Sequence, residues 1–334
     1  MKDSSKLNPS KPITLRFVNW VDPERQGIHF FSELIANVTG REVSVVDHPK
    51  SKVDIEVVSV YGQQIIPSIT TRAYRFFHSY LPSGIPFEGG KHTPNQQPTG
   101  NSRFSIFFTG ENERPPEGTW DAYLTFDIHS YGGRNEYLPL WWITSSDLLI
   151  PTVSPYLGKE ITLDELLRPR ISQYKPRNKF CVAFIGKAYP FRMHALTALS
   201  KVGKVDVYGG IARNTSRNSA IEKYKIAQDY KFVFAFENDL FPGYVTEKAP
   251  EAWATGAIPL YWGFDIRKTF NPAAMLNLMD YSNLDSYVDA VAEIEKSESK
   301  WVEMANQPLL LERPSLKAVI ELLRVKLAPL IARE

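Results

Sequence analysis

The feature that most constrains the fold is a regular alternation of strand and helix patterns in the second half of the chain. Four short apolar runs are separated by three segments with helical character. We expect strands at residues 179–185, 204–208, 231–236 and 257–262, and helices at 191–201, 221–230 and 245–255. Strands and helices that alternate in this way predict a Rossmann-like open sheet, whose ligands bind at the carboxyl ends of the strands. No G-x-G-x-x-G motif follows any of these strands, so a dinucleotide coenzyme is not expected.

The first half of the chain carries a weaker version of the same pattern. Strands are expected at residues 13–20, 54–61, 103–109 and 122–128, a helix from 27 to about 40, and a loop at 91–100. Since 334 residues suit two domains, we predict an α/β protein with an N-terminal domain and a C-terminal domain joined by a proline-containing linker. The predicted boundaries are 1–155 for the first domain, 156–177 for the linker, 178–310 for the second domain, and 311–334 for a last helix that packs back on the body.

Charge and cysteine content exclude several classes of protein. Lys and Arg number 39 against 37 Asp and Glu, a net charge of +2, so nucleic acid is not an expected partner. Cys181 is the single cysteine, which excludes an intramolecular disulfide and every cysteine-based zinc site. No stretch reaches the about 18 apolar residues of a membrane span, and the polar first dozen residues do not resemble a signal peptide. The last helix has a broad apolar face, for which packing onto the body is preferred over binding at a membrane surface.

The densest group of polar residues lies between the strand that ends at Phe236 and the helix that follows it. Glu237 and Asn238 come first, and Tyr244, Thr246, Glu247 and Lys248 follow Gly243. A helix amino end favours an anion such as a phosphate, and a lysine there opposes the helix dipole unless an anionic ligand lies opposite. In this reading Thr246 caps the helix and Glu247 accepts hydrogen bonds from hydroxyl groups of a ribose or sugar. A capped surface helix with an incidental Glu–Lys pair remains the alternative.

Other charged residues lie near the expected strand ends of both domains. Arg192 is placed to bind a diphosphate with its guanidinium fork, and Arg213 is a weaker candidate of the same kind. Glu111 follows an apolar strand and suits a general base in an interdomain cleft. Asp127 and His129 end the next strand and can line the same cleft. For each of these side chains, simple exposure to solvent is the competing interpretation.

A metal site has little support in the sequence. The six histidines are scattered, and neither H-E-x-x-H nor Asp-x-Asp occurs anywhere in the chain. A diphosphate bridged by a metal through an Asp-x-Asp motif is therefore not expected.

Residues 231–263, KFVFAFENDLFPGYVTEKAPEAWATGAIPLYWG, closely resemble the signature of the α1,3/4-fucosyltransferases, in particular the bacterial-type enzymes. Residues 108–112, 137–142 and 207–215 resemble further landmarks of that family in the expected order. The resemblance covers roughly residues 100–280, and the first 90 residues have no match in it.

This resemblance implies a GT-B fold, in which two Rossmann-like domains face each other across a cleft, with GDP-fucose in the second domain and the acceptor sugar in the first. By motif, Glu111 resembles the family's general base, which deprotonates an acceptor hydroxyl for a single in-line displacement that inverts the anomeric centre. Arg192 and Lys248 resemble the pair that neutralises the departing diphosphate. This implies that no cofactor is required, with a divalent cation as a stimulant at most.

The remaining site residues follow from the same resemblance. Glu247 would bind a donor ribose hydroxyl or the fucose ring, while Asn238 and Tyr244 would contact the donor sugar or phosphate. Further donor-binding candidates are Tyr208 and Arg213, and the acceptor-binding candidates are Asp127, His129, Trp141 and Trp142. The two tryptophans can stack on sugar rings, but burial in the core is an equally good interpretation.

The resemblance predicts transfer of L-fucose to the 3-hydroxyl or 4-hydroxyl of N-acetylglucosamine or glucose in a galactose-containing acceptor. Expected acceptors are Lewis-type oligosaccharides, glycolipids and lipopolysaccharide, and the expected location is the cytoplasm, including a peripheral position at the inner face of a membrane. Pro242 and Pro250 depart from the family pattern, and Pro250 should remove a helix hydrogen bond or shift the helix start. The alternatives are a GT-B transferase that uses another nucleotide sugar, such as GDP-mannose, and a sugar-binding protein without catalytic activity.

Overall fold

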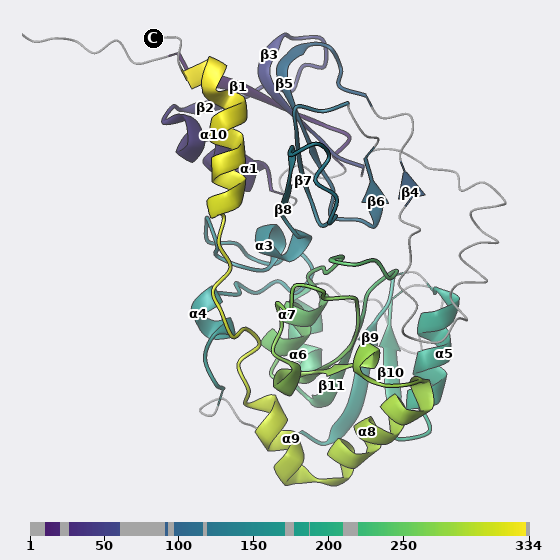
Figure 1. Cartoon of the computed structure of the whole chain (residues 1–334). Coiled ribbons are helices and arrows are strands. Elements are labelled where there is room, and N and C mark those ends of the chain that lie inside the picture. Colours follow the sequence, from purple (N-terminus) through teal and green to yellow (C-terminus); the bar gives the residue numbers. More distant parts are fainter. Residues whose placement is uncertain are drawn as a thin grey trace, which may run out of the picture.

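The computed structural model describes residues 11–20, 27–60, 91–92, 97–115, 119–170, 177–186, 188–209 and 220–331. Its main elements are two parallel β-sheets, each accompanied by helices, which lie one above the other in Figure 1. The two α/β units predicted from the alternation of strand and helix patterns are therefore present.

The N-terminal sheet has the strand order β2-β1-β3-β5-β7-β8, and every neighbouring pair is parallel. Its central strands coincide with the expected apolar runs. The strands are β1 (Ile13–Val18), β2 (Val43–Val45), β3 (Val53–Val58), β5 (Ser102–Phe108), β7 (Ala122–Thr125) and β8 (Asn135–Tyr137), and helix α1 covers Ile28–Thr39.

Short strands were missed by the sequence prediction. Both edges of the N-terminal sheet, β2 and β8, are three residues long. The expected loop at 91–100 is wrong at its first two residues, because β4 (Lys91–His92) pairs in parallel with β6 (Glu113–Arg114). Strands this short have no periodicity to detect and form only where tertiary contacts bring two segments together.

The C-terminal sheet has the order β10-β9-β11-β12-β13, again entirely parallel. The four strands predicted there are all present, as β9 (Lys179–Phe184), β10 (Val205–Tyr208), β11 (Tyr230–Phe236) and β12 (Ile258–Trp262), and the structure adds β13 (Leu276–Asn277). The three helices between them are α5 (Pro190–Leu199), α6 (Ala220–Ala227) and α7 (Lys248–Ala254). The remaining elements are α3 (Leu140–Thr144), α4 (Leu163–Leu166), η2 (Pro272–Ala274), η3 (Leu278–Asp280), α8 (Leu284–Lys296), α9 (Glu298–Ala305) and α10 (Lys317–Ile331).

Helix α7 begins three residues later than predicted. It starts at Lys248 with Glu247 as the N-cap residue, and no side chain caps it, so the capping role expected of Thr246 is wrong. Pro250 is therefore the third residue of the helix, where the missing backbone N–H would have no partner within the helix. Of the two effects anticipated for this proline, a lost hydrogen bond or a shifted helix start, the structure shows the later start.

The last helix returns to the N-terminal domain after α8 and α9 have completed the C-terminal one. Figure 1 shows α10, in yellow, beside α1, and these two helices are in contact. Its buried face consists of Val319, Leu323, Leu327 and Leu330. At its end, Arg41 Nη1 donates a hydrogen bond of 3.2 Å to the carbonyl of Leu330. No helix in the described part of the chain has the length and apolarity needed to cross a bilayer.

The loop between β11 and α7 lies directly against the N-terminal domain. Gly243 has a φ of 86°, and a Cβ atom there would come within 2.6 Å of the Phe126 carbonyl oxygen. Around this contact the Phe126 ring packs edge-on against Phe241 and Tyr244, at centroid distances of 5.6 and 5.1 Å. A side chain at position 243 would push the domains apart, so this glycine permits the close approach of the two sheet ends.

Candidate functional site

A cavity of about 370 Å³ lies where the carboxyl ends of the two sheets face each other. Gly110 and Glu111, just after β5, and Leu140 at the start of α3 contribute from the N-terminal domain. The C-terminal domain contributes charged and polar residues from α5, the end of β11 and the start of α7. Six of the predicted site residues line this single cavity: Glu111, Arg192, Asn238, Tyr244, Glu247 and Lys248.

A buried carboxylate, to which the sequence interpretation assigned no role, is in contact with Lys248 of the C-terminal wall. Glu237, at the end of β11, accepts hydrogen bonds from the backbone N–H and the hydroxyl of Thr246, at 2.8 and 2.6 Å. The Tyr261 hydroxyl donates to Oε1 at 3.1 Å, and Lys248 Nζ lies 3.1 Å from Oε2. These four contacts satisfy the buried carboxyl group of Glu237 and hold the start of α7 in place.

Lys248 is fixed in front of this carboxylate and reaches the cavity. Its ammonium donates to Thr246 Oγ1 at 2.9 Å and also pairs with Glu247 at 3.4 Å, and 17% of the side chain is exposed. Burial works to lower the pKa of Lys248, but the carboxylates of Glu237 and Glu247 outweigh it and raise that pKa. Lys248 is thus a permanent, positioned cation on the cavity wall.

Arg192, from the first turn of α5, is the second cation of the wall and is buried. Its Nη1 donates to Asn238 Oδ1 at 3.0 Å, whereas Nε is buried without a partner among the described residues. Burial is the main cause that lowers its pKa, but a guanidinium does not lose its proton in proteins. A buried cation that no carboxylate of the described residues contacts through a hydrogen bond favours an anionic ligand.

Glu111 faces this pair of cations from the N-terminal domain. It follows β5 in a tight turn, in which its backbone N–H donates to Thr109 Oγ1 at 3.1 Å and its carbonyl accepts from the same hydroxyl at 2.9 Å. Its carboxylate is near enough to contribute to the raised pKa of Lys248. The turn therefore presents a carboxylate to the cavity on the side opposite α7.

Three titratable residues of the cavity were missed by the sequence interpretation: Tyr156, Lys223 and Glu251. Burial, followed by the carboxylates of Glu247, Glu251 and Glu111, raises the pKa of the Tyr156 hydroxyl, which therefore keeps its proton. None of the three belongs to a local motif. Glu251 alone had a usable signal, because it lies one helical turn after Glu247 and shares its face.

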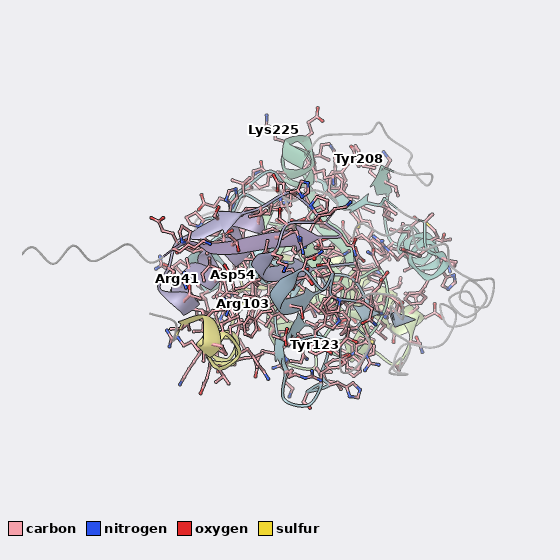
Figure 2. All side chains as sticks on the ribbon, turned by 90° about the horizontal axis from the view of Figure 1, so that it is seen from above. Arg41, Asp54, Arg103, Tyr123, Tyr208 and Lys225 are labelled. Carbon is pink, nitrogen blue, oxygen red and sulfur yellow. The ribbon has the colours of Figure 1, made fainter. Side chains whose placement is uncertain are left out.

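Several predicted site residues lie away from the cavity. Tyr208 ends β10, the outer strand of its sheet (Figure 2), and its ring packs at 5.6 Å on Phe184, which does line the cavity. Asp127 is buried and accepts hydrogen bonds from Arg114 Nε at 2.5 Å and from the Tyr131 hydroxyl at 2.7 Å. His129 is exposed beyond it. Arg213 lies outside the described residues.

Trp141 and Trp142 belong to the hydrophobic core of α3 and its surroundings. Both side chains are buried, and neither lines the cavity. Trp141 packs against Phe270 and Trp142 against Tyr137, at centroid distances of 5.9 and 5.7 Å. The core interpretation of these two residues therefore fits the structure, and the arrangement gives no support to their stacking on an acceptor.

The cavity combines the groups needed to transfer a glycosyl unit from an anionic leaving group. Two fixed cations lie on one wall, an acidic side chain at the amino end of α7 lies beside them, and a carboxylate that can accept a proton lies on the other wall. Among the described residues, no group of three or more His, Cys, Asp or Glu side chains is arranged to hold a metal ion.

Comparison with protein families matches residues 175–306 to the C-terminal model of glycosyltransferase family 10 (fucosyltransferase). An α-(1,3)-fucosyltransferase of Helicobacter pylori is 28% identical over 219 residues, which are 60% of this chain and 46% of that protein. A putative fucosyltransferase of Acanthamoeba polyphaga mimivirus is 30% identical over 150 residues, 40% of this chain and 24% of that protein. The chain thus spans about half the length, or less, of these curated relatives.

Comparison with solved structures extends the likeness to nearly the whole chain. A crystal structure of an α1,3-fucosyltransferase superposes with a TM-score of 0.66 at 20% identity, covering 98% of this chain and 93% of that one. The same holds for a complex of an α1,3-fucosyltransferase with GDP-fucose, with a TM-score of 0.65. The predicted GT-B fold and the predicted family resemblance are both confirmed.

Proposed function

Since residues 175–306 match the C-terminal model of glycosyltransferase family 10 (fucosyltransferase), we propose that this protein is a fucosyltransferase that moves L-fucose from GDP-fucose to a hydroxyl group of a glycan. The observation that carries the proposal is one cavity that joins Arg192, Glu247 and Lys248 from the family segment to Glu111 from the other domain. Donor and acceptor would meet there, each held by its own domain.

In this mechanism the donor diphosphate lies against the two fixed cations. Arg192 and Lys248 stabilise the negative charge that grows on GDP as the bond between fucose C1 and the phosphate oxygen breaks. Because both cations are held by protein partners before the donor arrives, little reorganisation is needed during the reaction. Glu247, with 12% of its side chain exposed beside Lys248, would accept hydrogen bonds from hydroxyl groups of the donor.

Glu111 acts as the general base. Its carboxylate removes the proton from the acceptor hydroxyl as that oxygen attacks fucose C1 from the face opposite GDP, so that one displacement inverts the anomeric configuration. The acceptor would be a galactose-containing glycan, modified at the 3-hydroxyl or 4-hydroxyl of N-acetylglucosamine or glucose. We further propose that the reaction requires no metal. The enzyme would be cytoplasmic and act on soluble or membrane-bound glycans.

The test is a mass-spectrometric assay with GDP-fucose and lactose, both isomers of N-acetyllactosamine, or no acceptor. We expect a deoxyhexose mass gain and GDP release that depend on the acceptor and survive a chelator. Glu111→Gln should lower kcat by about 10²–10⁴-fold while GDP-fucose still binds. Glu293→Gln is the matched control, since Glu293 is an exposed carboxylate on α8 and should leave the rate unchanged.

Three outcomes would contradict parts of the proposal. Consumption of a different nucleotide sugar, with GDP-fucose ignored, would overturn the donor assignment. Glycan binding without turnover would make the protein a binding module. Normal turnover by a folded Glu111→Gln variant would remove Glu111 as the base.

A further inference from the structure

A single carboxyl group joins the two walls of the cavity. Glu251, on α7 one turn beyond Glu247, lines the cavity and accepts hydrogen bonds on Oε1 from the hydroxyl groups of Ser145 and Ser154. Both serines are fully buried, and they lie 106 and 97 residues away along the chain. No described residue donates to Oε2, the other oxygen of this carboxyl.

Ser154 organises the turn that carries part of the opposite wall. Its Oγ accepts hydrogen bonds from the backbone N–H groups of Tyr156 at 3.3 Å and Leu157 at 3.1 Å, while it donates to Glu251. Tyr156 and Leu157 both line the cavity. The carboxyl on α7 therefore fixes the position of this turn through one hydroxyl.

Ser145 makes the same connection for helix α3. It follows the last residue of α3, and its Oγ lies 3.3 Å from Glu251 Oε1. Leu140, the first residue of that helix, also lines the cavity. Two segments from before the C-terminal sheet are thus attached to the helix that carries Glu247 and Lys248.

The charge balance of the cavity depends on the protonation of this group. Its described cations are Arg192, Lys223 and Lys248, and its other carboxylates are Glu111, Glu247 and the adjacent Glu237. A neutral Glu251 leaves three charges of each sign, whereas an ionised Glu251 adds a fourth carboxylate. The extra negative charge would oppose the binding of any diphosphate.

The surroundings of Glu251 favour the neutral form. Burial and the neighbouring carboxylate of Glu247 raise its pKa to about 8, although the Ser154 hydroxyl, the Lys223 ammonium and the Ser145 hydroxyl act in the opposite direction. Tyr156 and Glu111 also face this region, the first as a neutral hydroxyl and the second as a further carboxylate. Neither Tyr156 nor Glu111 supplies a positive charge that would favour the ionised form, so Glu251 stays protonated near neutral pH.

We propose that Glu251 is a positioning residue of the donor site that works as a neutral carboxylic acid. It holds the 154–157 turn and the end of α3 against α7, and it keeps a further negative charge away from the donor diphosphate. Only the identity of the donor rests on the function proposed above.

The first test is calorimetric binding of GDP-fucose to the full chain and to Glu251→Gln, at about pH 6.5 and about pH 9. The glutamine keeps the acceptor oxygen for both serines but cannot ionise. Affinity of the unmodified protein should fall by about fivefold to tenfold at the higher pH, a coupling near one pKa unit. The affinity of Glu251→Gln should fall by no more than about twofold, because its side chain cannot ionise. Any titration of the nucleotide itself affects both proteins equally and so does not alter the difference between them. Glu293→Gln should behave as the unmodified protein does.

The second test needs no nucleotide and so separates this inference from the proposed donor. Because the pKa of Glu251 is raised above the ordinary carboxyl value of 4.5 to about 8, the folded state binds an extra proton in that interval. Stability should therefore fall as pH rises from about 4.5 to about 8, and Glu251→Gln should remove this part of the decline. The expected Tm advantage of the variant near pH 8 is at least about 2–4 °C.

Ser154→Ala supplies the positioning readout. Losing this hydroxyl should raise KM for GDP-fucose with little change in kcat, and its effect should be non-additive with that of Glu251→Ala. An identical pH dependence in the unmodified protein and Glu251→Gln, in binding and in Tm, would overturn the inference. If GDP-fucose binds neither protein while the Tm difference appears, the donor assignment fails and the role of Glu251 stands.

Discussion

Two buried glutamates, one in each domain, have nearly the same surroundings and different consequences. In the N-terminal domain, Glu56 on β3 accepts the backbone N–H of Thr99 at 2.8 Å and the Thr99 hydroxyl at 2.6 Å. Arg16 on β1 completes the group, with Nη2 3.0 Å from Glu56 Oε2 and 2.7 Å from Thr99 Oγ1.

The C-terminal domain repeats this arrangement with a lysine. Glu237 accepts from Thr246 at the same two distances, 2.8 and 2.6 Å, and Lys248 contacts both the threonine hydroxyl and the carboxylate. In each domain, then, a threonine binds the carboxylate with two hydrogen bonds and a cation bridges the pair.

The difference lies in what else the cation contacts. Arg16 is 3% exposed and donates two more hydrogen bonds of 2.8 Å to the carbonyls of Pro49 and Ser51, so both of its terminal nitrogens, Nη1 and Nη2, are engaged within the protein. Lys248 is 17% exposed and lines the cavity. The same local chemistry therefore supports a sheet in one domain and presents a positive charge to the cavity in the other.

The largest effect that would sharpen this comparison is expected for Arg16→Met. Loss of the cation leaves Glu56 buried and unpaired, which should lower the free energy of unfolding by about 3–5 kcal/mol. Denaturant unfolding measures this change. The rate of fucosyl transfer per folded molecule should equal that of the unmodified protein. A selective loss of donor affinity would instead show that the Arg16 group contributes to the site as the Lys248 group does.

Lys248→Met should have the complementary effect on activity. We expect kcat/KM to fall by about 10²–10³-fold, because one of the two cations facing the leaving diphosphate is lost. Steady-state kinetics with GDP-fucose is the measurement. Lys300→Met, at an exposed lysine of α9, is the control and should be neutral. An active Lys248→Met variant would mean that this group is as purely structural as that of Arg16.

The hydrogen bonds between each threonine and its carboxylate can also be compared directly. Thr99→Val and Thr246→Val each remove one hydroxyl from a buried carboxylate and should each cost about 1–3 kcal/mol of unfolding free energy. Only Thr246→Val should also raise KM for the donor, since its hydroxyl holds Lys248 at 2.9 Å. Equal KM effects from both variants would argue for a general loss of rigidity.

The smallest effect is expected at the Asp54–Arg103 pair, which lies at the surface of the N-terminal sheet (Figure 2). Burial works to raise the pKa of Asp54, but hydrogen bonds from Thr14 and the Arg103 guanidinium lower it on balance. The resulting stability is present above the ordinary value of 3.8 and is lost as pH falls below it. Arg103→Ala should cost under about 1 kcal/mol near neutral pH by denaturant unfolding. A larger loss would show that this exposed pair contributes to stability as much as the buried Arg16–Glu56 pair does.

Much of the fold was predictable because its signals are local. The apolar runs that became β9, β11 and β12 are buried on both faces and read as continuous hydrophobic segments. The start of α7 was the instructive error, since helical periodicity extends back to residue 245 while Glu237 holds Thr246 outside the helix.

The candidate site was predictable only where a motif carries it. Glu111, Arg192 and Lys248 stand at the ends of recognisable strands or starts of helices, and the structure brings them to one cavity. Tyr156 lies in a segment with no such pattern, and Lys223, near the start of the predicted helix 221–230, has no polar motif around it, so nothing local marks either residue. For Trp141 and Trp142 the sequence left two interpretations open, because aromatic residues suit sugar binding and core packing equally well.

The amino-acid sequence by itself determined the order of the main strands and helices, the parallel sheets that this order requires, and the gathering of polar residues at 236–248 between a strand end and a helix start. These properties depend on periodicity and on backbone geometry within a few residues. The tertiary structure alone decided that Glu251 meets Ser145 and Ser154, and that Lys248 reaches the cavity while Arg16 does not. Desolvation and charge pairing depend on which distant segments come together, and a local sequence pattern does not predict those long-range contacts.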